Sequence, residues 1–168
     1  MKAAVSILML LLGAAAAVLA DTPQPAPATY EVASSNGKYF AFVDARNKST
    51  IVFDNQNPRV RRELWRIPGY HTSVFVSDDG GYLVIGYAGQ NLLPLDYTKD
   101  TVAFTVYHDG KMTGQVTFGE LIHDFSKLKM TASHYSWGSI LSLSDHSLLI
   151  DTVEGQKTFD VQSLTFIQ

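Results

Sequence analysis

The fold is decided by the stretch SSNGKYFAFV at residues 34–43, which returns 43 positions later as SDDGGYLVIG at residues 77–86. A third, shorter copy, SDHSLLID, occupies residues 144–151. In each copy a polar turn precedes an apolar run, and Asn36-Gly37 supplies the positive φ angles that a tight hairpin needs. The repeat therefore predicts three units that each begin with a β-hairpin.

Each unit is predicted to contain four antiparallel strands. The expected strands are 30–34, 39–43, 50–54 and 63–67, then 73–77, 82–85, 101–107 and 111–118, and finally 140–144, 148–150, 157–161 and 164–167. The second strand of each unit is apolar on both faces, which indicates sheets packed between neighbours. Four strands in a period near 43 residues are typical of a β-propeller blade. We therefore predict an all-β, antiparallel fold of three blade-like units.

Three units are fewer than closed propellers use, so an open or partial propeller is expected, or a ring that a partner chain completes. The alternative fold is an ordinary β-sandwich. One short helix is also predicted, because Thr117-x-x-Glu120 is a capping box and Leu121, Ile122, Phe125 and Leu128 follow at helical spacing. This helix is expected to cover a sheet edge or end; docking of a partner is the alternative.

The N-terminal residues read as an export signal. Residues 1–20 combine a basic start, an apolar run and an A-x-A-like end, which predicts a signal peptide cleaved before Asp21. Residues 21–28 form a Pro-rich leader, and residues 29–168 form a single domain. No later apolar run reaches the roughly 18 residues of a spanning helix, and the chain has no cysteine to carry a lipid. A periplasmic or secreted protein without membrane insertion is expected.

Composition excludes several classes of protein. Loss of Lys2 with the signal leaves 12 basic residues against 16 acidic ones, a balance that disfavours nucleic acid as a partner. The absence of cysteine excludes a disulfide-stapled mini-domain. Stability is therefore expected to come from burial of the 19 aromatic residues and their apolar neighbours.

Two stretches carry a resemblance to known proteins. SDDGGYLVIGY at residues 77–87 is similar to the turn-and-strand signature of propeller-type repeats. Segments between Leu64 and Phe159, such as LWRIPGYH (64–71), NLLPL (91–95), SHYSWG (133–138) and TVEGQ (152–156), resemble a poorly characterised group of small exported bacterial proteins with propeller-like repeats. The resemblance implies an exported bacterial β-protein and transfers no catalytic residue.

Motifs of catalysis and cofactor binding are absent from the sequence. It holds no H-E-x-x-H, G-x-S-x-G or phosphate-loop motif and no cysteine ligand, so we predict no cofactor and no metal. A hydrolytic site that pairs His134 with a serine such as Ser73, Ser133 or Ser139 lacks an identifiable third member. The sequence therefore favours a protein that is not an enzyme.

Two groups of residues are candidate partner-binding sites. Tyr70 and His71 precede the second unit, and His134, Tyr135 and Trp137 precede the third, so the repeat predicts that these five residues share one rim. Such aromatic residues anchor recognition surfaces, but they also fill the space between blades. The second group is Arg61, Arg62, Trp65 and Arg66. Its arginines either dock an acidic partner or protect an outer edge strand by charge.

These observations lead to three functional hypotheses. The first is a non-enzymatic exported module that binds another protein, for example an inhibitor or immunity protein, with a homo-oligomer as a compatible assembly. The second is a small-molecule or glycan-binding protein whose aromatic rim stacks on sugar rings. The third is a hydrolase that uses His134.

Overall fold

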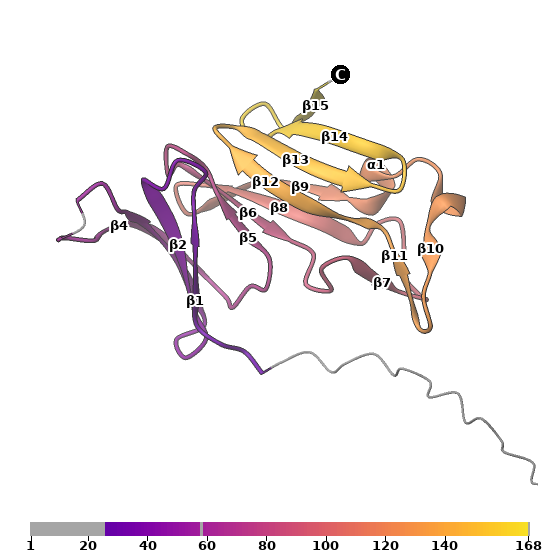
Figure 1. Cartoon of the computed structure of the whole chain (residues 1–168), viewed down its shortest axis with the longest axis horizontal. Helices are drawn as coiled ribbons and strands as arrows, with labels where there is room; N and C mark the ends of the chain where they lie inside the picture. Colours follow the sequence, from indigo (N-terminus) through magenta and orange to yellow (C-terminus); the bar gives the residue numbers. More distant parts are fainter. Residues whose placement is uncertain (1–25, 58, 168) are drawn as a thin grey trace, which may run out of the picture.

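The structure is a computed structural model that describes residues 26–57 and 59–167. Within these ranges almost all regular structure is β, arranged as four antiparallel sheets (Figure 1). The predicted all-β, antiparallel class is thus confirmed. The predicted signal peptide, residues 1–20, and the first part of the Pro-rich leader lie outside the described residues, and Ala26 to Thr29 form no regular element.

Three of the sheets are four-stranded, and in each one the spatial order of the strands follows the chain. Sheet I contains β1 (Tyr30–Ala33), β2 (Tyr39–Asp44), β3 (Ser49–Asp54) and β4 (Arg62–Pro68). Sheet II contains β5 (Val74–Val76), β6 (Tyr82–Gly86), β8 (Val102–His108) and β9 (Lys111–Thr117). Sheet III contains β12 (Gly138–Ser144), β13 (Ser147–Thr152), β14 (Gly155–Asp160) and β15 (Thr165–Ile167). All twelve predicted strands are present, with shifts of a few residues at their ends.

The fourth sheet was not predicted. It consists of β10 (Lys129–Met130), β11 (His134–Ser136) and β7 (Leu92–Pro94) and lies at the right of Figure 1. Its strands are only two or three residues long, too short for an alternating pattern to stand out in the sequence. The small sheet joins the loop that follows β6 to the segment that enters sheet III.

The predicted helix is present but shorter than its apolar spacing suggests. Helix α1 (Phe118–Leu121) begins with the predicted capping box, in which the Thr117 amide donates to the Glu120 carboxylate at 2.7 Å. It ends at Leu121 because Ile122 is extended, and a separate 3₁₀ turn, η1 (Phe125–Lys127), follows. The Asp124 side chain accepts from the Ser126 amide and starts this new turn, an alternative that short polar side chains offer to a continuing helix.

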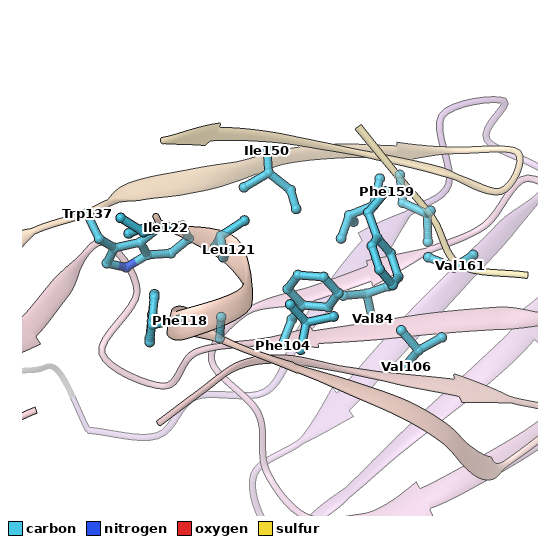
Figure 2. Packing of buried hydrophobic residues seen from close by; sticks show 14 of the residues in the cluster. Val84, Phe104, Val106, Phe118, Leu121, Ile122, Trp137, Ile150, Phe159 and Val161 are labelled. Carbon is cyan, nitrogen blue, oxygen red and sulfur yellow. The ribbon is translucent and has the colours of Figure 1, made fainter. Parts of the chain in front are cut away.

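Sheet II is packed between sheets I and III. One apolar cluster joins Val43 and Val52 of sheet I to Leu83 of sheet II. The other joins the opposite face of sheet II to sheet III, with the rings of Phe104 and Phe159 at 5.1 Å in an edge-to-face contact (Figure 2). Both faces of the central sheet are therefore buried, which explains the apolar run in β6.

The repeated turns of the sequence share one geometry. Ser34 Oγ accepts from the Tyr39 amide at 3.1 Å, and Ser77 Oγ accepts from the Tyr82 amide at 2.9 Å. Gly37 and Gly80 both adopt positive φ, at 70° and 72°. The repeat is thus a structural repeat, because its serine and glycine have the same duties in both copies.

The first hairpin turns of the three large sheets also meet one another. The Asp78 carboxylate accepts from the Asn36 amide of sheet I at 2.6 Å and from the Asp145 amide of sheet III at 3.2 Å. The Ser35 hydroxyl donates to the Leu143 carbonyl oxygen at 3.0 Å. We call this meeting point the turn junction. It joins the three sheets at one end of their first strands, and at the other end these strands surround a groove.

Candidate functional site

The groove lies between the first strands of the three large sheets and has a volume of about 640 Å³. Its lining comes from β1, from β5 with the residues before it, from the loop after β6, and from the start of β12. The residues are Tyr30, Val32, Thr72, Ser73, Val74, Phe75, Tyr87, Gln90, Asn91, Ser136, Trp137, Gly138, Ser139 and Ile140. This volume is in the range of ligand-binding pockets.

The groove continues toward the turn junction. A second hollow of about 270 Å³ is lined by the same three strands farther along their length, and Val32 and Phe75 line both. The two hollows therefore adjoin each other along β1, β5 and β12. An extended occupant fits this shape better than a compact one.

No lining residue of the groove is charged. Burial, with the nearby Tyr70 hydroxyl as the smaller cause, raises the pKa of Tyr30 to about 12, so this phenol stays protonated at neutral pH. Its hydroxyl donates to the carbonyl oxygen of His71. The groove therefore offers neutral hydroxyl and amide groups beside aromatic rings, and it selects against ions.

Trp137 is a core residue at the bottom of this site. Only 2% of its surface is exposed, and its ring contacts Phe118 edge-to-face at 5.1 Å (Figure 2). The indole Nε1 donates to the Gln90 carbonyl oxygen at 2.7 Å, and the Trp137 amide donates to that of Asn91 at 3.2 Å. Trp137 thus holds the loop after β6 in place, and little of its ring is available to a partner.

Tyr70 and His71 are close to the groove without lining it. The Tyr70 ring packs edge-to-face on Tyr30 at 6.4 Å, and its hydroxyl accepts from the Ala28 amide at 3.3 Å. His71 folds back so that Nε2 lies 3.2 Å from the Pro68 carbonyl oxygen. Gly69 permits this, because a Cβ there would lie 2.8 Å from the imidazole. Both residues contact Tyr30, Tyr70 through its ring and His71 through its backbone carbonyl oxygen.

His134 and Tyr135 belong to β11 of the small sheet. The His134 Nδ1 atom lies 2.8 Å from Ser133 Oγ, and Tyr135 contacts the Tyr97 ring at 5.8 Å. Neither residue lines the groove, although the next residue, Ser136, does. The segments before the second and third units therefore reach the groove from Thr72 and from Ser136 onward. His71 and His134 lie beside the groove.

The arginine group forms no free cationic patch. Arg61 pairs with Glu31 at 2.6 Å and Arg62 with Asp54 at 3.0 Å, and Arg66 pairs with Glu63. Trp65 points toward sheet II, where its indole Nε1 donates to the Gly80 carbonyl oxygen at 2.9 Å. Each arginine already has its own carboxylate, so an acidic partner gains less here than the sequence suggests.

Several groove residues were missed by sequence reasoning. Tyr87, Gln90 and Asn91 lie in the loop between β6 and β7. Tyr87 and Asn91 fell within stretches quoted for their resemblance to other proteins, but none of the three was selected as a site residue. Tyr30 was read only as part of a strand. The one available signal was the repeat itself, because it aligns the first strands of the three units and these strands form the groove.

Among residues 26–57 and 59–167, no group of three or more acidic or histidine residues is placed to hold a metal ion. No helix in the same ranges is long and apolar enough to cross a membrane. A scan of family models, a search of curated proteins and a search of solved structures each found no match to this chain. The resemblance to exported propeller-like proteins therefore stays a prediction.

Proposed function

We propose that this protein is a non-enzymatic binding module that holds an uncharged, extended segment of a partner protein in the groove. The observation that carries the proposal is the composition of the groove: the first strand of each large sheet contributes to two adjoining, uncharged hollows. Ligand sites are commonly formed in this way, where several rigid elements converge.

The backbone of these strands favours a peptide as the occupant. In the order of each sheet, β1, β5 and β12 are end strands, so each has one edge that no strand of its own sheet pairs. An extended peptide can add to such an edge through main-chain hydrogen bonds, with its alternate side chains in the neighbouring hollows. Recognition of this kind needs no charge, in agreement with the neutral lining.

We further propose that the three large sheets are the blades of an open, propeller-like array. Their identical strand order and the position of their first strands around one groove support this arrangement. Export to the periplasm or the medium is proposed from residues 1–20 alone. Mass spectrometry of the protein recovered from cells tests it, with Asp21 as the expected N-terminal residue; an intact Met1 would refute cleavage.

The binding proposal is tested by capture of partners from an extract of the exported fraction, with Ser139→Asp against Ser147→Asp. Ser139 lines the groove, whereas Ser147 is exposed at the turn of sheet III. We expect Ser139→Asp to abolish capture of a stoichiometric partner and Ser147→Asp to retain it. The partner segment protected from hydrogen exchange should be extended and uncharged. Equal capture by both variants would exclude the groove as the binding site.

A glycan is the second candidate occupant, for a specific reason. The hydroxyl and amide groups of Thr72, Asn91 and Ser139 lie in the same groove as the rings of Tyr30 and Tyr87, a combination that suits a sugar. A thermal-shift screen with neutral oligosaccharides distinguishes the two, because a ligand of the folded state raises Tm by mass action. A rise that Ser139→Asp removes would favour the glycan.

A further inference from the structure

The outward face of sheet I carries two rows of side chains with an unusual composition. Phe40 and Phe53 lie side by side on β2 and β3 and stack at 5.1 Å, and Phe42 and Ile51 form the adjacent row. None of these four residues belongs to the clusters that join the sheets. In a sheet with one face in solvent, polar and apolar residues ordinarily alternate along each strand, so the side chains on the solvent face are polar. This face is aromatic and aliphatic at its centre: Phe40 and Ile51 are already buried within the single chain, whereas Phe42 and Phe53 are partly exposed.

Charged side chains of sheet I itself cover these rows. The Arg61 guanidinium lies 4.5 Å from the centre of the Phe40 ring and reaches Glu31 beyond it. Arg66, next to Ile51, pairs with Glu63. These arginines remain 53% and 57% exposed, so their charged ends stay in contact with solvent.

The opposite end of the stack has a different character. On sheet III the outward rows consist of Ser142, Leu149, Thr158 and Ile167, and of Ser144, Ser147, Asp160 and Thr165. Leu149 and Ile167 are their two large apolar members, and Thr158 separates them. Sheet III therefore ends the stack with a largely polar face, whereas four adjacent apolar residues lie at the centre of the face of sheet I. The molecule has one face built like an interior surface.

We propose that this face of sheet I packs against the same face of a second copy of the chain. The order of charges across one row supports this occupant. From β1 to β4 the row reads Glu31, Phe42, Ile51, Arg66, negative at one edge and positive at the other. A two-fold axis parallel to the strands places β1 of one copy over β4 of the other. Glu31 and Arg66, which pair with Arg61 and Glu63 in their own copy, then lie opposite each other across both edges. The apolar residues meet between them.

Two sheets that pack face to face with aligned strands form the ordinary core of a β-sandwich. The arginines and carboxylates of this face balance one another, so two copies do not repel as they approach. A strongly acidic or basic partner lacks this match. This face would thus be covered by the same face of a second copy. The groove would stay open in each copy, because the groove residues of β1, Tyr30 and Val32, lie on the opposite face of sheet I from Glu31.

The test is the mass of the full-length exported protein in solution as a function of concentration. We expect a monomer–dimer equilibrium in which Phe53→Ser raises the dissociation constant about tenfold or more, because the apolar contact of a phenylalanine is worth at least 1.4 kcal/mol. The matched control is Leu149→Ser on the outward face of sheet III, which should leave the constant unchanged. The groove variant Ser139→Asp should also leave it unchanged, which separates this proposal from the proposed function.

A charge exchange keeps the proposal testable if Phe53→Ser fails to fold. Arg66 is exposed, so Arg66→Glu should preserve the fold while it places like charges opposite each other in the dimer. Adding Glu31→Arg in the same chain should restore dimerisation. A wild-type protein that stays monomeric at all concentrations would overturn the proposal. So would a dimer that Phe53→Ser, Arg66→Glu and Leu149→Ser leave equally intact.

Discussion

Replacement of Trp137 should strongly lower the free energy of unfolding, although this residue lies beside a candidate binding site. Its side chain is 2% exposed and packs on Phe118. Trp137→Ala should therefore cost about 3–5 kcal/mol, the usual range for removal of a buried aromatic ring. Because domains of this size are stable by only about 5–15 kcal/mol, the loss is about a fifth of the total or more.

Trp137→Phe separates the ring from its hydrogen bond. It keeps an aromatic ring but leaves the Gln90 carbonyl oxygen without the indole donor at 2.7 Å, which should cost about 1–3 kcal/mol. Trp65→Phe is the matched control. Its indole also donates to a carbonyl oxygen, that of Gly80 at 2.9 Å, but Trp65 is only half-buried, so water can replace the bond and the loss should be smaller.

Urea denaturation followed by far-UV circular dichroism measures these differences, with an unchanged m value as the sign that both states are comparable. Hydrogen exchange adds a local readout: amides of residues 87–91 should exchange faster in Trp137→Phe than in the wild type. A loss below about 1 kcal/mol for Trp137→Ala would contradict the burial argument, since no fully buried tryptophan is that dispensable. Trp137 would then return to the candidate partner-binding residues.

Three further predictions concern stability, each measured by chemical or thermal denaturation. Gly138→Ala should lower the free energy of unfolding by about 1 kcal/mol or more beyond the loss in Gly155→Ala. Both glycines have positive φ, but a Cβ at Gly138 would lie 2.1 Å from a backbone oxygen of β13, whereas no atom lies within 4 Å of a Cβ at Gly155. Equal losses in the two variants would contradict this prediction. A hydrogen bond from Lys157 and others from backbone amides lower the pKa of Glu154 from 4.5 to about 2, so the stability that this carboxylate contributes is complete above pH 4.5 and is lost as the pH falls toward 2. Glu154→Gln should flatten that part of the pH profile, and an unchanged profile would exclude the effect. Asp78→Ala should cost about 1–3 kcal/mol, since it removes the acceptor shared by two sheets; a neutral result would mean that the turn junction adds nothing.

The repeat made much of the fold predictable. Ser34 and Ser77 have the same hydrogen-bonding duty, and each copy begins a four-stranded sheet, so alignment of the copies located the strands. The small sheet was beyond reach because Leu92–Pro94 is too short to show a period. The helix was predicted too long because apolar spacing took no account of Asp124, whose side chain starts a separate turn.

The candidate site was predictable in its place but less so in its residues. The repeat predicted one rim formed by the segments before the second and third units, and Thr72 and Ser136 of these segments line one groove. Side-chain direction was not accessible in the same way. Trp137 points into the core, and each of the three arginines finds a carboxylate, that of Glu31 lying 30 positions away in sequence. The pair of Arg61 with Glu31 depends on tertiary structure, whereas Arg66 pairs with Glu63 only three positions away on the same strand.

The turn junction has a consequence for the order in which the chain assembles. The Ser35 hydroxyl and the Leu143 carbonyl oxygen that it meets are 108 positions apart, and Asp78 and the Asp145 amide are 67 apart. Each large sheet is built from neighbouring segments and can form early. The contact between the first and last sheets must wait for residue 143, and that between the second and last sheets for residue 145. Until then sheet II has one apolar face without its cover, so closure of the junction is the late step that ends the period of greatest risk of aggregation.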